Sequence, residues 1–252
     1  MTTPWNDADK AKWLSEQKVQ RSYHEDVVTQ LHTLNNIFTI EQYGALSLDI
    51  ARYPLYLIKS RQWRNENKTV LITGGVHGYE TSGVQGAISF LETQAQEYQQ
   101  QFNILMVPCV SPWGYETINR WNPGALDPNR SFYSGSPVEE SSALMAYISS
   151  LSTEFIAHID LHETTNTDNT EFRPALAARD GTEHHNWDIP DGFYLVANTA
   201  RPEPGFQKAI IKAVEKVTHI APADENGKLI GVPLAQYGVI NYAARELGLC
   251  MG

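Results

Sequence analysis

Short apolar runs alternate along the chain with segments whose apolar residues recur at helical spacing. Five runs have the residue content of buried strands: residues 53–59, 69–73, 102–110, 155–161 and 193–198. Three segments have the helical period: residues 80–100, 139–151 and 204–218. Strands that alternate with helices predict an α/β fold, a three-layer α/β/α domain built on a mostly parallel mixed sheet.

The start of the chain and the segments between these elements complete the expected fold. Residues 1–50 are expected to form a helical lead-in. Residues 111–137 are rich in Gly, Pro, Asn and Trp and predict a long loop, a length that is typical of functional loops. Residues 163–192 are expected to form a polar loop, and residues 238–249 a helix.

Composition narrows the class of protein. Hydrophobic residues make up 42% of the 252 residues and charged residues 19%, which is ordinary usage for a globular protein. The chain contains no internal repeat or low-complexity linker, so residues 1–252 are expected to form a single domain. The net charge of −10 argues against a nucleic-acid partner, because binding phosphates requires clustered lysine and arginine residues. An anionic substrate stays compatible with this charge, since a local pocket can oppose the global sign.

The two cysteines and the apolar runs bear on the compartment. Cys109 and Cys250 lie far apart in the sequence and outside any CxxC spacing, which favours a reducing environment. The first 20 residues are polar and charged, unlike a signal peptide. The chain contains no run of about 18 apolar residues, the length that predicts a membrane-spanning helix. We therefore expect a cytoplasmic protein with no membrane partner.

A histidine and a glutamate three residues apart follow the predicted strand at residues 69–73. His77 and Glu80 lie in a glycine-rich turn just past the carboxyl end of this strand, the edge at which open α/β sheets bind ligands. An isolated HxxE pair is more typical of a solvated helix surface. At this position, however, the two side chains can converge on one metal ion, and zinc accepts both imidazole and carboxylate ligands.

A third ligand is expected from the strand at residues 155–161. His162 follows its last residue and should therefore reach the same edge of the sheet. Strand alternation places Asp160 on the same side, where a carboxylate can orient a ligand histidine. Three protein ligands with one open position are typical of catalytic zinc sites, so His77, Glu80 and His162 predict one zinc ion per chain.

Five segments in the same order resemble the zinc carboxypeptidases, in the broad clan that also holds succinylglutamate desuccinylase and aspartoacylase. Residues 74–80 resemble the family's GxxHxxE motif, and residues 111–115 (SPWGY) are similar to its Asn-Pro-Asp-Gly-Tyr turn. Arg120 falls where the family has an arginine. Residues 127–132 (DPNRSF) resemble the family's Asp-Leu-Asn-Arg-Asn-Phe segment, and residues 160–162 match its strand that carries the third ligand. The resemblance implies a fold of the zinc-dependent exopeptidase (phosphorylase/hydrolase-like) type.

The resemblance also implies roles for three polar residues. Arg120 corresponds to the arginine that polarises the scissile carbonyl, where a guanidinium stabilises developing oxyanion charge. Asn129 and Arg130 correspond to the pair that binds the terminal carboxylate of the substrate, which a guanidinium fork matches in a bidentate way. The implied substrate is a peptide or an acyl-amino acid with a free carboxylate.

The family's general base is a glutamate on a strand downstream of the third ligand, and no glutamate here falls on such a strand. Glu246 lies in the predicted helix at residues 238–249, and Glu163 directly follows a ligand. The chain is therefore expected to stop short of its last strand, and residues beyond Gly252 to carry the base.

Three functions are compatible with these patterns. The first is a metallocarboxypeptidase that hydrolyses a C-terminal peptide bond or a similar amide beside a free carboxylate. The second is an N-acyl-amino-acid amidohydrolase of the desuccinylase or aspartoacylase type, which uses the same metal site. The third is a zinc-binding or peptide-binding module without catalysis, which the missing glutamate favours.

Overall fold

The computed structural model describes residues 3–235 and 238–242, and the chain forms two compact units. The first unit is Asn6–Glu163. The second consists of Thr164–Gly252 together with Met1–Trp5. The prediction of a single domain over residues 1–252 stays a prediction, and each unit is described separately below.

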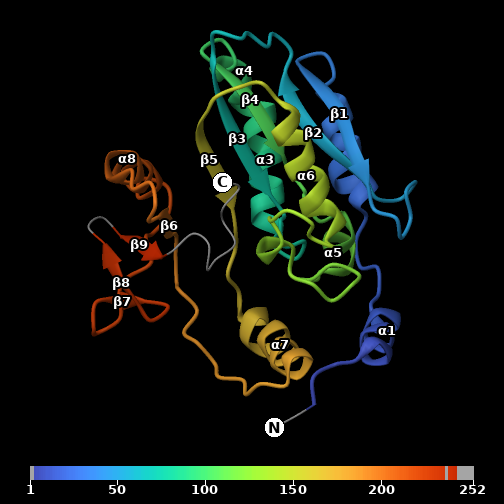
Figure 1. Cartoon of the computed structure of the whole chain (residues 1–252). Helices are drawn as coiled ribbons and strands as arrows, with labels where there is room; N and C mark the ends of the chain where they lie inside the picture. The colour runs from blue at the N-terminus through green and yellow to red at the C-terminus, as the bar shows by residue number, and fades with distance from the viewer. Residues whose placement is uncertain (1–2, 236–237, 243–252) are drawn as a thin grey trace. The chain divides into compact units, whose positions relative to one another are not determined.

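The first unit contains a five-stranded mixed sheet in the order β1-β2-β4-β3-β5 (Figure 1). Its strands are β1 (Phe38–Ala45), β2 (Pro54–Ser60), β3 (Lys68–Gly74), β4 (Phe102–Val107) and β5 (Phe155–Leu161). β3 pairs in parallel with both β4 and β5, whereas β1 and β2 pair antiparallel. The α/β class and the mixed sheet with flanking helices are confirmed. The carboxyl ends of β3 and β5 meet at one edge, as the sequence predicts.

Helices of the first unit cover the sheet. They are α1 (Asp7–Glu16), the π-helix η1 (His24–Val28), α2 (Thr29–Thr33), α3 (Thr81–Thr93), α4 (Ala95–Tyr98), α5 (Pro112–Thr117), the short 3₁₀ helix η2 (Pro128–Arg130) and α6 (Glu139–Ser150). The apolar residues of η1, α2 and α3 pack against Ile58, Ile72 and Met106 in the main core. A smaller cluster joins Leu55 to Ala143 of α6. Because Leu55 and Ile58 differ in strand parity, these two helix groups lie on opposite faces of the sheet.

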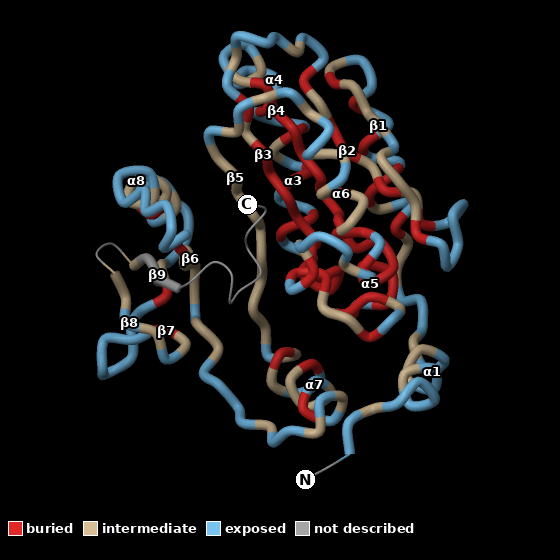
Figure 2. Tube along the Cα trace, viewed as in Figure 1, coloured by how far each residue is buried: buried red, intermediate tan, exposed pale blue. Residues whose placement is uncertain are grey.

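The second unit has its own small sheet. Its strands, in the order β6-β9-β8-β7, are β6 (Leu195–Asn198), β9 (Val239–Tyr242), β8 (Val232–Ala235) and β7 (Lys228–Leu229). Its helices are the π-helix η3 (Asp168–Phe172), α7 (Arg173–Asp180) and α8 (Pro204–Val214). Buried residues are concentrated in the first unit and are sparser in the second (Figure 2).

Two expectations for the first unit are corrected by the structure. The predicted helical lead-in over residues 1–50 contains strand β1, in which Phe38 and Ile40 alternate with polar residues and pack on the main core. The predicted loop over residues 111–137 contains helix α5. α5 begins with Pro112 at its first turn, where a missing N–H has no cost, so the Pro and Gly that suggested a loop are compatible with this short helix.

Two expectations for the second unit are also corrected. The predicted polar loop over residues 163–192 contains η3 and α7, and α7 ends at Gly181 in the left-handed conformation that glycine favours. The predicted helix over residues 238–249 is wrong where the structure describes it, because residues 239–242 form β9 between β6 and β8. Pairing on both sides outweighs local helix preference there. Residues 243–252, which include Glu246, lie outside the described residues.

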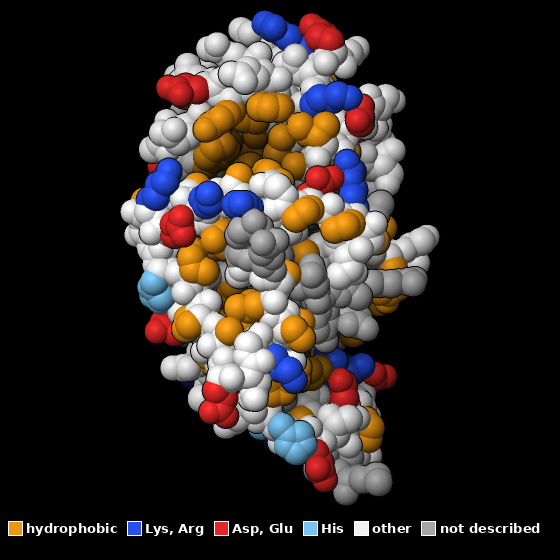
Figure 3. All heavy atoms as spheres, turned by 90° about the vertical axis from the view of Figure 1, so that its left-hand side faces the viewer, with side chains coloured by type: hydrophobic (Ala, Val, Ile, Leu, Met, Phe, Trp, Pro, Cys, Tyr) orange, Lys and Arg blue, Asp and Glu red, His pale blue; other side chains and the backbone are white. Residues whose placement is uncertain are grey.

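The helices and the surface add two observations about partners. Within the described residues, every helix is too short or too polar to cross a bilayer. On the face shown in Figure 3, lysine and arginine side chains lie interspersed with aspartate and glutamate side chains. The exclusion of nucleic acid stays a prediction.

Replacement of Ile58 by alanine should lower the free energy of unfolding by about 2–5 kcal/mol, because the side chain is fully buried in the main core. Urea unfolding followed by circular dichroism measures this change. Ile156→Ala is the matched control, since Ile156 is 37% exposed on β5 and should cost well under half as much. Equal losses in the two variants would contradict the assigned core.

Candidate metal centre

The turn that connects β3 to α3 depends on two glycines. Gly75 has a φ of +58°, and a Cβ atom there would lie 2.6 Å from Val84. A Cβ atom on Gly78 would lie 2.0 Å from the backbone of Gly114 and of Tyr115 in α5. Only glycine therefore allows residues 75–80 to lie directly against this helix.

Hydrogen bonds fix the same turn to the segment around α5. The amide of Tyr79 donates to the carbonyl of Asn119 over 3.1 Å. The hydroxyl of Ser111 donates to the carbonyl of Val76 over 2.7 Å. The backbone on both sides of His77 is therefore held before any ligand binds.

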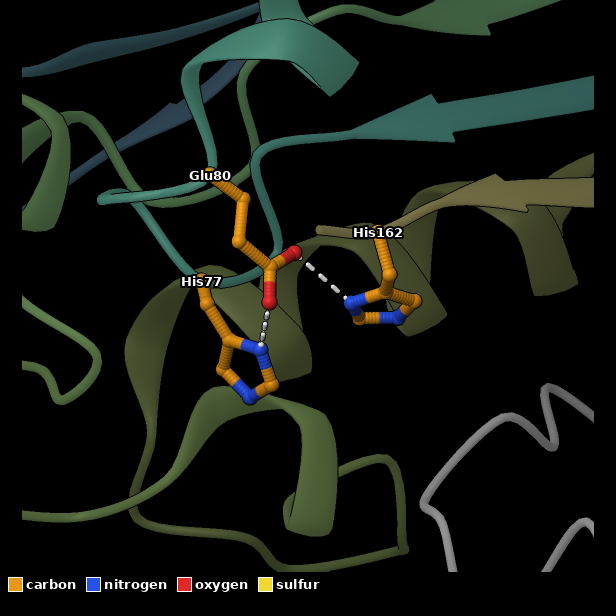
Figure 4. Close-up of side chains that lie close together, drawn as sticks. All are labelled: His77, Glu80 and His162. Carbon is orange, nitrogen blue, oxygen red and sulfur yellow. Dashed lines mark hydrogen bonds and ion pairs between the residues drawn. The ribbon is translucent and has the colours of Figure 1, made fainter. Parts of the chain in front are cut away.

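Glu80 lies between two histidines, as Figure 4 shows. His77 Nδ1 is 2.7 Å from Glu80 Oε1, and His162 Nδ1 is 2.8 Å from Glu80 Oε2. One ligand atom from each of the three residues can be chosen so that all lie within 4.8 Å of one another. The structure thus brings together the three residues that the sequence singled out from two separate strands.

A second carboxylate contacts the far side of each imidazole. His77 Nε2 is 2.9 Å from Asp127 Oδ1, and His162 Nε2 is 2.8 Å from Asp160 Oδ2. A carboxylate next to Nε2 favours the tautomer with the proton on that nitrogen, so Nδ1 is the atom that can present a lone pair to a metal ion. Both rings are therefore oriented as metal ligands through Nδ1.

Asp160 is itself hydrogen-bonded to Thr73 of β3, which also contacts His158 of β5. Thr73 Oγ1 donates to Asp160 Oδ1 over 2.6 Å and lies 2.9 Å from His158 Nε2. Since the hydroxyl proton is used on Asp160, the His158 ring donates to Thr73 Oγ1. Burial lowers the pKa of His158, so its neutral form is favoured. Asp160 is thus held from both sides.

The charges of the metal-free cluster are strongly coupled. Burial on its own raises the pKa of Glu80, but the two histidines outweigh it and lower the pKa to about 2. Burial likewise raises the pKa of Asp160, and His162 outweighs it, so this pKa is also about 2. Burial lowers the pKa of His162, but Asp160 and Glu80 outweigh it and raise the pKa well above the ordinary value. The cluster therefore favours a cation between its carboxylates.

A divalent ion fits this donor set. Two imidazoles and one carboxylate are ligands that zinc accepts, and both imidazoles have the outer carboxylate that is usual for metal-bound histidine. His77 and Glu80 are buried, whereas the His162 side chain is 24% exposed, so the cluster can be reached from one side. Binding there would displace the proton that His162 holds in the metal-free state.

Asp127 connects the cluster to the arginine predicted to be catalytic. Its Oδ2 accepts from Arg120 Nε over 3.3 Å, and Arg120 also donates to the hydroxyl of Tyr79 over 3.4 Å. Burial raises the pKa of Asp127, but His77 and Arg120 outweigh it and hold the pKa well below its usual range. Arg120 and His77 therefore contact the same carboxylate, that of Asp127. The side chain of Arg120 is 20% exposed.

The two residues predicted to bind substrate lie on η2, directly after Asp127. The amide of Asn129 donates to Asp127 Oδ1 over 2.9 Å, so the same carboxylate caps this short helix. Asn129 is buried, and its side-chain Oδ1 has no hydrogen-bonding partner among the described residues. Arg130 is exposed, and its charge contributes to the low pKa of Asp127.

Two glutamates considered as general base are placed differently. Glu163 directs its carboxylate to Ser82, accepting from the backbone amide and the hydroxyl at 3.1 and 2.9 Å. It is therefore engaged at the start of α3 and not at the cluster. Glu246 lies outside the described residues.

Sequence reasoning missed the structural roles of Asp127 and Thr73. Asp127 precedes Pro128, and an acidic residue before a proline usually indicates only a turn or a cap. Thr73 lies in an apolar run, where threonine is a common strand residue. Its position directly opposite Asp160 follows from the register between β3 and β5, which the sequence does not specify.

Comparison with known proteins gives a family match. The sequence profile of the succinylglutamate desuccinylase/aspartoacylase catalytic domain matches residues 66–196, a little over half of the chain. The matched segment includes all three residues of the His-Glu-His cluster. No protein of curated function matches the chain significantly.

Several solved structures share the fold. A protein from Shewanella denitrificans, provisionally named a metallopeptidase, has a TM-score of 0.62 and 20% identity over 90% of this chain and 78% of its own. A similarly named protein from Shewanella amazonensis has a TM-score of 0.58 and 20% identity over 90% of this chain and 81% of its own. A provisionally named carboxypeptidase A from Shewanella denitrificans has a TM-score of 0.50 and 16% identity, covering 98% and 58%. At these identities the likeness shows the fold.

The metal-free protein should lose stability as the pH falls from about 5 to 2. Glu80 and Asp160 have folded-state pKa values of about 2, below the unfolded values of about 4, so their contribution is present above pH 4 and lost below it. Asp160→Asn removes one of these two groups and should flatten the slope, by on the order of 2 kcal/mol across this interval. Urea unfolding of chelator-treated protein at several pH values measures the slope.

The exposed Asp7 provides the control for this experiment. Asp7→Asn should keep the slope of the unmutated protein. If the free energy of unfolding of Asp160→Asn fell with pH as steeply as that of the unmutated protein, the assigned coupling of Asp160 to His162 would be wrong.

Proposed function

The chain belongs to the succinylglutamate desuccinylase/aspartoacylase catalytic domain family, and on this premise we propose that it is a zinc-dependent hydrolase of an amide bond beside a free carboxylate. The observation that carries the proposal is the cluster of His77, Glu80 and His162, whose ligand atoms lie within 4.8 Å of one another. Family membership supports a hydrolase, and the cluster supports the metal.

His77 Nδ1, Glu80 and His162 Nδ1 would hold the zinc ion. When bound, zinc supplies Lewis-acid polarisation of the scissile carbonyl and lowers the pKa of water. Asp127 and Asp160 keep the two rings in the tautomer that presents Nδ1. Their low pKa values in the metal-free protein are consistent with this arrangement, because ionised carboxylates are the better acceptors for the Nε2 protons.

Arg120 is proposed to stabilise negative charge on the carbonyl oxygen of the substrate. Asp127 and Tyr79 direct its guanidinium, so little ordering is needed when a substrate binds. Its side chain is 20% exposed, so it lies where a ligand can approach it. A fixed donor of this kind is worth about 3–4 kcal/mol of transition-state energy in other hydrolases.

Asn129 and Arg130 are proposed to bind the free carboxylate of the substrate. Arg130 supplies a charged fork at the surface, and the preceding Asn129 has a side-chain NH2 group, the kind of donor that a carboxylate accepts from. Both residues follow Asp127, so the carboxylate site and the outer shell of His77 belong to one rigid turn.

Two substrate classes share this chemistry. A peptide with a free C-terminus is the first candidate, because the long segment that contains Arg120 favours it, whereas Asn129 and Arg130 would serve both classes. An N-acyl amino acid is the second, and the family match over residues 66–196 favours it. A panel of C-terminal peptides and of succinyl and acetyl amino acids, assayed with the zinc-loaded protein, separates the two.

Purified protein should contain one zinc ion per chain, and His162→Ala should lose most of it. Three protein ligands determine the affinity, and removal of one leaves two. Mass-spectrometric metal analysis after dialysis measures the stoichiometry. His185→Ala, at an exposed histidine outside the cluster, should keep the full stoichiometry. Stoichiometric zinc in His162→Ala would sink the ligand assignment.

Arg130→Ala should raise KM for substrates with a free carboxylate without changing zinc content. A lost hydrogen bond between charged groups costs roughly 1.5–3 kcal/mol, about 10- to 150-fold in affinity. Steady-state kinetics with paired free and amidated substrates measures the effect, and Arg61→Ala controls for removal of an exposed arginine elsewhere. Equal cleavage of free and amidated substrates by the unmutated protein would rule out the anchor.

A further inference from the structure

The segment between α1 and η1 contacts the turn of the metal centre. Its residue Arg21 is half-buried and donates three hydrogen bonds to two different parts of the first unit. Nη2 donates to the carbonyl of Gly78 over 2.7 Å, and Nη1 donates to the hydroxyl of Thr81 over 2.5 Å. Nε donates to the carbonyl of Tyr115 over 2.5 Å. The guanidinium therefore joins the ligand turn to helix α5.

Two of these contacts are made to the residues that directly follow the two ligands of the turn. Gly78 directly follows His77, and Thr81 directly follows Glu80, so Arg21 holds one atom next to each ligand. The same guanidinium lies 3.6 Å from the centroid of the Tyr115 ring, which fixes its plane. Arg21 thus binds the turn at the point where Gly78 lies against the backbone of α5.

The neighbours of Arg21 along the chain keep it in place. The backbone amides of Gln20 and Arg21 both donate to the carbonyl of Glu116, at 2.8 and 3.4 Å. Asn119 donates to the side chain of Gln17 over 2.9 Å. Further back, the ring of Trp13 lies 5.9 Å from that of Trp113. The segment and the preceding helix α1 are therefore attached to α5 and to Asn119, which follows it.

An arginine suits this position because all three acceptors are neutral oxygens in fixed directions. A guanidinium offers five donors in one plane and stays protonated, whereas a lysine ammonium is a point charge on a flexible stem. An ion pair would need a carboxylate partner, but these three contacts end on two carbonyls and a hydroxyl. The arrangement therefore orients backbone and does not pair charge.

We infer that Arg21 is a positioning residue for the metal centre, which holds the turn so that His77 and Glu80 stay aligned for one ion. This inference rests on the proposed function, since it assigns a supporting contact to the same site. Its three hydrogen bonds end on Gly78, Thr81 and Tyr115 and not on the ligand side chains. Its effect reaches the ion through the backbone of residues 78 and 81.

Cobalt binding tests the inference without an activity assay. Metal-free protein is titrated with Co²⁺ alone, and the visible absorption of the bound ion reports both affinity and ligand geometry. Arg21→Gln should raise the Co²⁺ dissociation constant about tenfold or more, as loss of an outer-shell contact does at other metal centres. Arg21→Lys should weaken binding similarly, because a lysine can restore at most part of the three-way contact.

Arg52→Gln is the matched control. Arg52 donates to Glu116 of α5 over 2.7 Å, so this variant also removes an arginine contact to the same helix but leaves the ligand turn untouched. Its Co²⁺ dissociation constant should stay within twofold of the unmutated value. Circular dichroism and thermal unfolding of each metal-free variant establish that it is folded, and Arg21→Lys carries the test if Arg21→Gln does not fold.

The outcomes separate the two hypotheses. Unchanged Co²⁺ affinity and spectrum in a folded Arg21 variant overturn the inference, even if its melting temperature falls. Equal weakening in the Arg21 and Arg52 variants also overturns it, because any loss of support for α5 would then suffice. If the unmutated protein bound no Co²⁺, or bound it unchanged after His162→Ala, the proposed function would fail and the inference with it.

Discussion

The metal centre depends on one interaction, the contact of both oxygens of Glu80 with two imidazole rings. A buried carboxylate is costly unless charge and hydrogen bonds compensate it, so each ring must be held at a defined place. His162 comes from the end of β5 and His77 from the turn after β3, and these two strands are adjacent and parallel. The sheet order thus determines whether the cluster can form at all.

The two carboxylates that contact the outer nitrogens of the histidine rings, Asp160 and Asp127, come from different elements. Asp160 is oriented by Thr73 within the sheet, whereas Asp127 belongs to the loop that also carries Arg120 and η2. The sheet side is held by hydrogen bonds between β3 and β5, and the loop side carries the residues proposed to bind the substrate.

The sequence predicted the features that follow from local pattern. The strands β2 to β6 were recognisable from their apolar runs, and the convergence of His77, Glu80 and His162 follows from the meeting of parallel strands at one edge. β1 and β9 were missed because strand pairing, which is a contact between distant segments, determines them. Asp127 and Thr73 were missed as site residues for the same reason: their partners are 50 and 87 positions away.

The close approach of Gly78 to α5 has a consequence for how this protein can vary. The atoms that a Cβ at position 78 would meet are backbone atoms of Gly114 and Tyr115, and position 114 is already glycine. No truncation of a neighbouring side chain can create the missing space. Position 78 therefore has no compensatory substitution available within the present backbone.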